Sequence, residues 1–234
     1  MLIETKLGDW VCPDEDASCN VAYKKYGDLS LYQSDELDCA LKFVKNFRTA
    51  VDIGAHIGLM SYKLSPLFES IHSFEIHEFM FKCLQKNKEN FHLNNVKIYN
   101  YGIGKEEKNV DIVYNEGKSF STHVNPDSVS GKYKIKPLDS FEFKNVDFLK
   151  IDAEGYESLI AQGALKTIIE SKPVILYERK DHAQRYGFER DSIVEILEPY
   201  GYFVLSRKKN NFKFKKSNAI MVCDQSLRSL SDGI

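Results

Sequence analysis

Short apolar runs alternate with helical patterns from residue 49 onward, and this alternation limits the possible folds. Strands are predicted at 49–54, 71–76, 96–103, 109–115, 146–154 and 173–179, with helices near 57–68, 78–94 and 156–171. The run at 146–154 is almost continuously apolar until its charged end, which is typical of a parallel strand covered on both faces. The pattern therefore predicts an α/β fold with a mostly parallel, doubly wound sheet.

The C-terminal part predicts an antiparallel end to this sheet. A helix over 191–200 is followed by two strands, 201–207 and 217–224, joined by a basic segment in which Asn210-Asn211 is a plausible turn. The segment 207–216 interleaves Lys and Arg with Phe, which suits either nucleic-acid binding or an edge hairpin protected by lysines. Because the net charge is −2, we favour the hairpin and expect no nucleic-acid partner.

The remaining segments suggest the domain organisation. Residues 1–47 are expected to form a cap of short strands plus an amphipathic helix, 34–47, with Ser34 as its N-cap. One domain is expected over 48–224, followed by a tail at 225–234. The polar stretch 115–134 lacks periodicity, so it is either a lid over a site or flexible surface.

Composition is that of an ordinary globular protein, with 43% hydrophobic and 28% charged residues among 234. The N-terminus does not resemble a secretory signal, and no apolar run is long enough to span a membrane. Of five scattered cysteines, Cys12 and Cys19 could form a bridge, but reduced thiols are the preferred interpretation. We expect a cytoplasmic protein.

Carboxylates stand where several predicted strands end: Asp52, Glu75, Asp152 with Glu154, and Glu178. Any one of them could simply be a favourable charge at a helix N-terminus. Four strands ending in this way place like charges along one edge of a parallel sheet, where ligands bind in such folds. The sequence therefore predicts a ligand site at that edge.

The loop "DIGAHIG" at 52–58 narrows the class of ligand. Gly54 and Gly58 allow backbone to approach a ligand at a helix N-terminus, but the loop lacks the G-x-G-x-x-G of dinucleotide sites. Asp52 would repel a pyrophosphate and suits a ligand that carries an ammonium group. Glu75 stands at the end of the next predicted strand, at the sequence spacing from the glycine-containing loop at which an acid binds ribose hydroxyls in such folds. A nucleoside joined to an amino acid, S-adenosylmethionine, fits these features.

The segments "VDIGAHIGLMSYKL", "SFEIHEFMFKCLQKN", "LDSF" and "FLKIDAEGYESLIAQGAL" resemble the FkbM family of S-adenosylmethionine-dependent methyltransferases. The resemblance covers about residues 48–206, and K-I-D-x-E-G-x-E at 150–157 is its most specific part. His56 stands where the family often has asparagine, and Ile76 replaces the proline of "FEP". The resemblance implies a Rossmann-like methyltransferase fold and transfer of a methyl group to a hydroxyl of a small molecule or glycan.

The resemblance also implies which residues bind the cofactor. Glu75, beside Ile76, would hold the ribose; Tyr101 and Gly102 would lie near the adenine; and Asp152 would lie beside the sulfonium and the acceptor. The methionine end would be held by Asp52, Gly54, Ala55, His56 and Gly58.

A hydroxyl acceptor must lose its proton, and candidate bases follow the same strands. Asp152 and Glu178 are favoured and His123 is a weaker third candidate, while Glu154 and His182 were also considered. Lys150 is expected to pair with a carboxylate, with Glu157 as its candidate partner. Metal-dependent methyltransferases of the catechol type use metal ligands after the fourth and fifth strands. Here the fifth strand ends with Glu178-Arg179, and a cation beside the second ligand position disfavours a divalent ion, so no metal is expected.

Two other functions remain open from the sequence. One is a nicotinamide-dependent oxidoreductase, which Asp52 and the missing third glycine disfavour. The other is a non-catalytic binding module of the same fold. Neither the acceptor nor the oligomeric state can be predicted.

Overall fold

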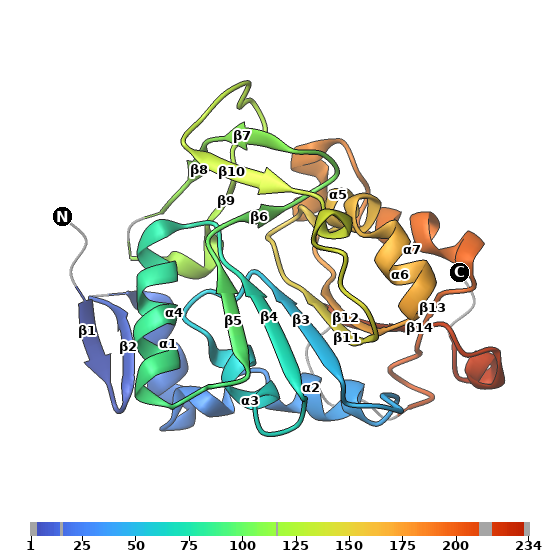
Figure 1. Cartoon of the computed structure of the whole chain (residues 1–234), viewed down its shortest axis with the longest axis horizontal. Helices are drawn as coiled ribbons and strands as arrows, with labels where there is room; N and C mark the ends of the chain where they lie inside the picture. Colours follow the sequence, from blue (N-terminus) through green and yellow to red (C-terminus); the bar gives the residue numbers. More distant parts are fainter. Residues whose placement is uncertain (1–3, 15, 116, 211–216, 232–234) are drawn as a thin grey trace.

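The computed structural model describes residues 4–14, 16–115, 117–210 and 217–231, and a seven-stranded sheet forms its centre (Figure 1). The strand order is β13-β14-β12-β11-β3-β4-β5. The strands are β3 (Thr49–Ile53), β4 (Ser70–Phe74), β5 (Val96–Tyr99), β11 (Val146–Ile151), β12 (Val174–Glu178), β13 (Phe203–Val204) and β14 (Asn218–Val222).

All neighbouring strands from β12 to β5 run parallel, whereas β14 is antiparallel to both β12 and β13. The predicted Rossmann-like sheet with an antiparallel end is therefore confirmed. The expected turn at Asn210-Asn211 lies partly outside the described residues, as does most of the basic segment 207–216.

Side chains of the central strands alternate between two apolar clusters, as expected for a sheet covered on both faces. Val51 and Ile53 of β3 pack in the cluster that includes α5 (Glu157–Gly163), α6 (Leu165–Ser171) and α7 (Ser192–Leu197). Ala50 packs on the other side with α2 (Ser34–Leu41) and α3 (Leu59–Leu64).

The N-terminal segment packs against the sheet domain through a third apolar cluster, which joins Trp10 and Ile57 to Met80 of α4 (Glu78–Asn90). It contains the antiparallel pair β1 (Glu4–Leu7) and β2 (Trp10–Pro13), then helix α1 (Ala17–Tyr26) and the short helix η1 (Leu29–Leu31). Helix α1 was not predicted, because only two of its residues are buried and its apolar pattern is weak.

Several predicted boundaries differ from the structure. Helix α2 ends at Leu41 rather than at 47, and its N-cap is Gln33 rather than Ser34, because Gln33 adopts a φ of 56° and Ser34 is already helical. The predicted helix 156–171 is divided into α5 and α6. The break lies where Gly163 packs against the backbone of Gly104, closely enough that a Cβ would lie 1.8 Å from the Gly104 oxygen.

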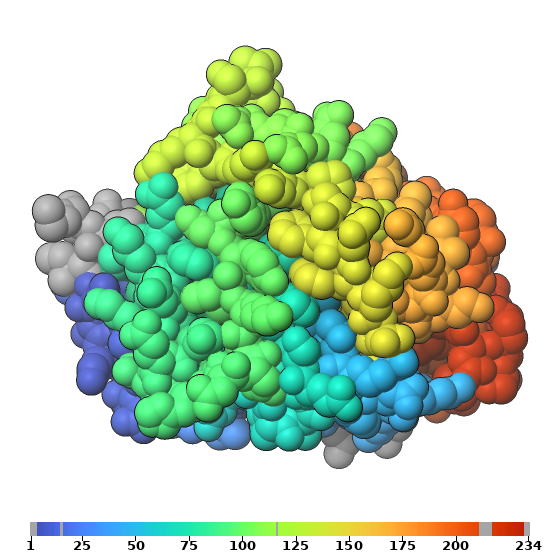
Figure 2. All heavy atoms as spheres, in the orientation of Figure 1, coloured from blue at the N-terminus to red at the C-terminus, as the bar shows by residue number. Residues whose placement is uncertain are grey.

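The predicted strand 96–103 ends at Tyr99, and the chain then leaves the central sheet. Gly102–Ile103 forms β6, which pairs with β10 (Tyr133–Lys136), and β10 pairs with β7 (Lys108–Val110). A hairpin of β8 (Ile112–Val113) and β9 (His123–Val124) completes this insertion. Figure 2 shows part of the insertion, in green and yellow, as a raised ridge at the top of the view.

The five cysteines are free thiols, so Cys12 and Cys19 form no bridge. In the part of the chain that the structure describes, no helix combines the length and apolar character that crossing a bilayer requires.

Candidate active site

A cavity of about 290 Å³ lies at the carboxyl ends of β3, β4, β11 and β12. Its floor is formed by strand ends and the loops that follow them, as expected for ligand sites in open parallel sheets. Two further segments complete its walls: Tyr32-Gln33 from the N-terminal cap, and residues 119–124 from the insertion. The cavity lies at the sheet edge where the sequence predicts a ligand site.

Glu75 connects the glycine-containing loop to the segment that follows β4. Its Oε2 accepts a hydrogen bond from the backbone N–H of His56, and its Oε1 accepts one from the N–H of His77, both at 2.8 Å. Burial raises the pKa of Glu75 to about 7, although these two hydrogen bonds act to lower it. Each oxygen keeps a second lone pair, so the carboxylate can still accept hydrogen bonds from a ligand in the cavity.

Asp52, which was expected to face a ligand's ammonium group, lies instead in the protein interior. Its side chain is fully buried and does not line the cavity. Oδ2 accepts a hydrogen bond from Ser61 at 2.7 Å, and Oδ1 lies 3.3 Å from Nζ of Lys150. An internal cation therefore balances the charge that the sequence analysis assigned to a ligand.

The two loop glycines are also explained by internal packing. A Cβ at Gly54 would lie 1.9 Å from the backbone oxygen of Asp152, so glycine allows the ends of β3 and β11 to approach each other. Gly58 has a φ of 97°, and a Cβ there would lie 2.7 Å from a methyl group of Leu84. Gly54 lines the cavity, whereas Gly58 does not.

The remaining predicted cofactor residues all line this cavity. They are Ala55, His56, Ile76, Tyr101, Gly102 and Asp152. Apolar residues that the sequence analysis did not single out complete the wall near Ile76 and Tyr101: Ile103, Val124, Ile135 and Tyr156. These side chains make this part of the cavity wall apolar.

The other end of the cavity is acidic. Asp152, Glu154 and Glu178 all line it, so two strand ends bring together the predicted carboxylates. Nε2 of Gln33 donates a hydrogen bond to Oδ2 of Asp152 at 3.3 Å. The ammonium of Lys180 contacts Glu178 and lies 3.3 Å from Oε1 of Glu154.

Glu178 has the most buried of these three carboxyl groups. Burial raises its pKa, and the nearby charges of Asp152 and Glu154 raise it further, while Lys180 acts in the opposite direction. Its Oε2 is buried and accepts no hydrogen bond from any residue that the structure describes. The protonated form is therefore favoured while the cavity holds no additional cation.

Lys150 pairs with Asp52 and not with Glu157. Its Nζ donates a hydrogen bond to the backbone oxygen of Gly54 at 2.8 Å and lies 3.8 Å from Oδ2 of Asp152. Burial alone would lower the pKa of Lys150, but Asp52 and Asp152 together raise it. Glu157 instead accepts hydrogen bonds from the backbone N–H groups of Ala153 and Gly155, at 3.0 and 3.2 Å. The second glutamate of the K-I-D-x-E-G-x-E motif thus shapes the turn after β11.

The predicted lid contributes Ser119, Phe120 and residues 122–124 to the cavity wall. Oγ of Ser119 lies 2.7 Å from Nε2 of His56, and its N–H donates a hydrogen bond to Asp16 at 2.8 Å. Tyr186 fastens the other side of this segment by donating its hydroxyl to the oxygen of Val124 at 2.7 Å. His123 lines the cavity, and its Nδ1 lies 2.9 Å from the backbone oxygen of Ser121.

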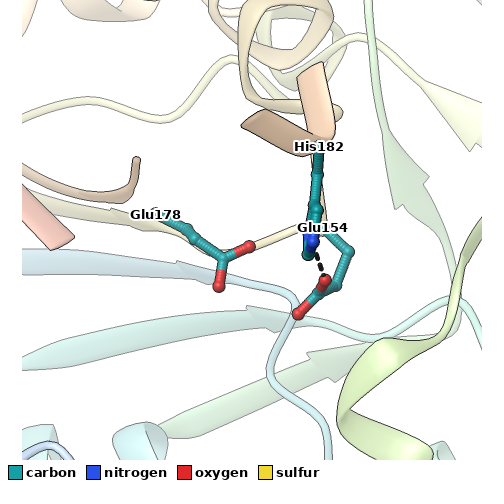
Figure 3. Close-up of side chains that lie close together, drawn as sticks. All are labelled: Glu154, Glu178 and His182. Atoms are coloured by element: carbon teal, nitrogen blue, oxygen red, sulfur yellow. Dashed lines mark ion pairs between the residues drawn. The ribbon is translucent and has the colours of Figure 1, made fainter. Parts of the chain in front are cut away.

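Sequence reasoning missed Tyr32, Gln33, Ser119 and Lys180 as site residues. Gln33 had no local signal, because its left-handed backbone conformation (φ 56°) is uncommon for glutamine and is not indicated by the sequence. Lys180 follows a strand-end acid by two residues, but the sequence does not show that its side chain folds back onto that acid. His182, considered as a base, lies with Nδ1 2.7 Å from Oε2 of Glu154 (Figure 3).

Comparison with known proteins agrees with this arrangement. The description "Methyltransferase FkbM domain" belongs to a family model that matches residues 52–204. Among solved structures, the chain is similar to the methyltransferase FkbM from Methylobacillus flagellatus KT, with 16% identity and a TM-score of 0.50. That match covers 89% of this chain but only 60% of the other, so the chain spans less than two thirds of that protein.

Two other matches have lower TM-scores. A putative methyltransferase from Streptococcus mutans, in complex with SAH, has 11% identity and a TM-score of 0.49 over 79% of this chain and 93% of that one. A TehB-like SAM-dependent methyltransferase from Corynebacterium glutamicum has 13% identity and a TM-score of 0.48 over 88% of this chain and 91% of that one. No curated protein matches the sequence.

The family match covers more than half of the chain and includes the glycine-containing loop, Glu75 and the acidic strand ends. This match supports a methyltransferase over the nicotinamide-dependent alternative. The chain belongs to the FkbM family of S-adenosylmethionine-dependent methyltransferases.

Proposed function

We propose that this protein transfers a methyl group from S-adenosylmethionine to a hydroxyl oxygen of a small molecule or glycan. One observation carries the proposal. A single cavity joins the loop around His56 and Glu75 to the carboxylates that follow β11 and β12. A donor and an acceptor bound at its two ends would meet beside Asp152.

The residues at the first end fit the cofactor. Glu75 would accept hydrogen bonds from the ribose hydroxyls through its free lone pairs. Ile76, Tyr101 and Gly102 would contact the adenine, and the absence of a side chain at Gly102 leaves Ile76 in place, since a Cβ would lie 2.8 Å from it. Ala55 and His56 would border the methionine end, whereas Asp52 and Gly58 would act by shaping the loop.

When bound, the cofactor supplies a methyl group already activated by its sulfonium, so alignment is the main task left to the protein. The acceptor oxygen forms a bond to the methyl carbon, and its proton must be taken up. Asp152 is the candidate to receive it, because it is the most exposed of the three carboxylates at the acidic end of the cavity. Gln33 would hold its carboxylate in place.

Glu178 has a different role in this scheme. A carboxyl group with a raised pKa remains protonated near neutral pH, so it would donate a hydrogen bond to the acceptor rather than remove a proton. His123 lies on the lid side of the same cavity. If its Nδ1 donates to Ser121, its Nε2 is left as an acceptor, so His123 stays a candidate base.

The test begins with calorimetric titration of the full chain with S-adenosylhomocysteine, and with NAD as the comparison. We expect micromolar binding of the former alone. Radiolabelled methyl transfer to a panel of hydroxylated sugars and phenols, with matched amines and thiols, then tests the acceptor atom. Transfer to amines but not to hydroxyls would refute O-methylation, and binding without transfer to any acceptor would favour a non-catalytic module.

A further inference from the structure

Three side chains at the acidic end of the cavity point toward a common centre (Figure 3). Glu154 follows β11, Glu178 ends β12, and His182 lies in the short helix η4 (Asp181–Tyr186). One potential ligand atom from each lies within 4.8 Å of the other two. Glu154 and Glu178 line the cavity itself, so this cluster borders the place where the acceptor would bind.

Glu178 supplies a second, independent indication that this cluster binds a ligand. The residue is only 8% exposed, and its Oε2 accepts no hydrogen bond within the described part of the chain. A buried carboxylate oxygen without a donor is unfavourable, and such atoms usually contact a water, an ion or a ligand. Because this oxygen belongs to a side chain that points at Glu154 and His182, an ion at their centre would satisfy it.

The cations already present do not fulfil this role. Lys150 is engaged by Gly54 and Asp52 on the other side of Asp152. Lys180 contacts Oε1 of Glu178, which leaves Oε2 without a partner. The side chain of Lys180 is 34% exposed, so its long stem can swing into solvent and release both carboxylates.

Arg179 does not oppose an ion here, contrary to the expectation from the sequence. Its guanidinium makes two hydrogen bonds to Asp191, with Nε 2.5 Å from Oδ1 and the second nitrogen 2.7 Å from Oδ2. These hydrogen bonds hold the guanidinium of Arg179 at Asp191, which is not one of the three clustered residues. The charge of Arg179 is therefore paired with Asp191.

We propose that Glu154, Glu178 and His182 bind a divalent transition-metal ion, Mn²⁺ or Zn²⁺, with the ammonium of Lys180 as its competitor. An imidazole nitrogen with two carboxylates suits these ions better than Mg²⁺ or Ca²⁺, which prefer oxygen ligands alone. Three protein ligands leave coordination positions open toward the cavity, as in metal sites that contact a substrate.

The position of the ion deepens the proposed function and rests on it. An ion bound there would keep Glu178 ionised, so Glu178 would hold the ion instead of donating a hydrogen bond to the acceptor. The ion would bind oxygen atoms of the acceptor and lower the pKa of the acceptor hydroxyl. It would favour acceptors with a second oxygen next to the methylated one, because both can occupy open positions. Binding of the ion itself does not depend on methyl transfer and can be measured without cofactor or acceptor.

The test is a titration of the full chain with Mn²⁺. Binding is monitored by the loss of the free-ion signal in electron paramagnetic resonance, and Zn²⁺ is then added as the displacing ion. We expect one saturable site per chain. Lys180→Met should tighten binding by about tenfold, because it removes the competing ammonium. Glu178→Gln and His182→Gln should each weaken binding by at least about tenfold, the scale of losses seen when a metal site is disturbed.

Matched controls are Glu195→Gln and His92→Gln, which change exposed residues of the same types elsewhere and should leave the titration unchanged. Circular dichroism identifies any variant that fails to fold, and His182→Gln in the Lys180→Met background provides a second measurement at a partly exposed position. The proposal is overturned if neither the natural chain nor Lys180→Met binds Mn²⁺, or if the glutamine variants bind it equally well. Either result would leave the binding of S-adenosylhomocysteine, and hence the proposed function, to its own test.

Discussion

Oγ of Ser119 lies 2.7 Å from Nε2 of His56, so the insertion is joined directly to the loop after β3. Ser119 is almost fully buried, and its backbone N–H also donates a hydrogen bond to Asp16 of the N-terminal cap. Three segments distant in sequence thus meet over the cavity. This contact makes the insertion a candidate lid whose closure depends on the loop.

Replacing Ser119 by alanine removes the contact with His56 but keeps the backbone bond to Asp16. A lost hydrogen bond of this kind costs about 1 kcal/mol, so we expect the affinity for S-adenosylhomocysteine to fall by roughly fivefold. Calorimetry measures this change. Ser140→Ala is the control, because it removes an exposed hydroxyl that donates to the backbone oxygen of Pro137. Equal affinities for the two variants would show that the contact does not help to close the cavity.

His56 should tolerate asparagine but not valine. Its φ is 53°, in the left-handed region where asparagine is well accepted and a β-branched side chain is strained. Burial lowers the pKa of His56 to about 4, so no charge is lost at neutral pH. In urea denaturation we expect His56→Asn to remain near the natural stability and His56→Val to lose about 1–2 kcal/mol. Similar losses of stability in both variants would show that backbone strain at position 56 is not the cause.

Glu75 should make cofactor binding depend on pH. Burial raises its pKa to about 7, above the ordinary value, so the protonated form is favoured below neutrality. Only the ionised form can accept hydrogen bonds from both ribose hydroxyls through both oxygens, so the affinity for S-adenosylhomocysteine should rise from pH 6 to pH 8. Glu75→Gln should bind more weakly and show a flat profile over this range. An unchanged pH dependence in that variant would assign the titration to another group.

Asp152 should be needed for turnover more than for folding. Asp152→Asn keeps the size of the side chain and removes the proton acceptor, so we expect kcat to fall about 100-fold or more, a typical loss for a general base. Cofactor affinity should change much less, because Asp152 borders only one end of the donor site. Methyl-transfer kinetics measure both effects, with the exposed Asp38→Asn as control. Natural activity in Asp152→Asn would exclude it as the base.

Gly54→Ala should prevent folding of the domain. A Cβ at this position would lie 1.9 Å from the backbone oxygen of Asp152, and neither strand end can move without breaking the β3–β11 pairing. Gly187→Ala is the matched control, because Gly187 has a similar φ of 76° but no atom within 4 Å of the added carbon. Thermal unfolding should show a modest loss for Gly187→Ala and no cooperative transition for Gly54→Ala.

The sequence by itself determined the sheet, its parallel strands and the edge at which Asp152 and Glu178 meet. Burial on two faces can be recognised in the local sequence, since a strand covered on both sides must be apolar at successive positions. Polar residues at the ends of such strands then stand out. Helix α1 could not be recognised in this way, because only two of its residues are buried and its helical period is weak.

Only the tertiary structure decided which partner each charged group has. Lys150 could have paired with Glu157, seven residues away, but the fold places it beside Asp52. Gln33 reaches Asp152 across 119 positions of sequence. Such contacts depend on how loops cross the sheet edge and not on local periodicity. The sequence therefore predicted that acids gather at this edge, and the packing determined which of them were balanced internally and which remained available to a ligand.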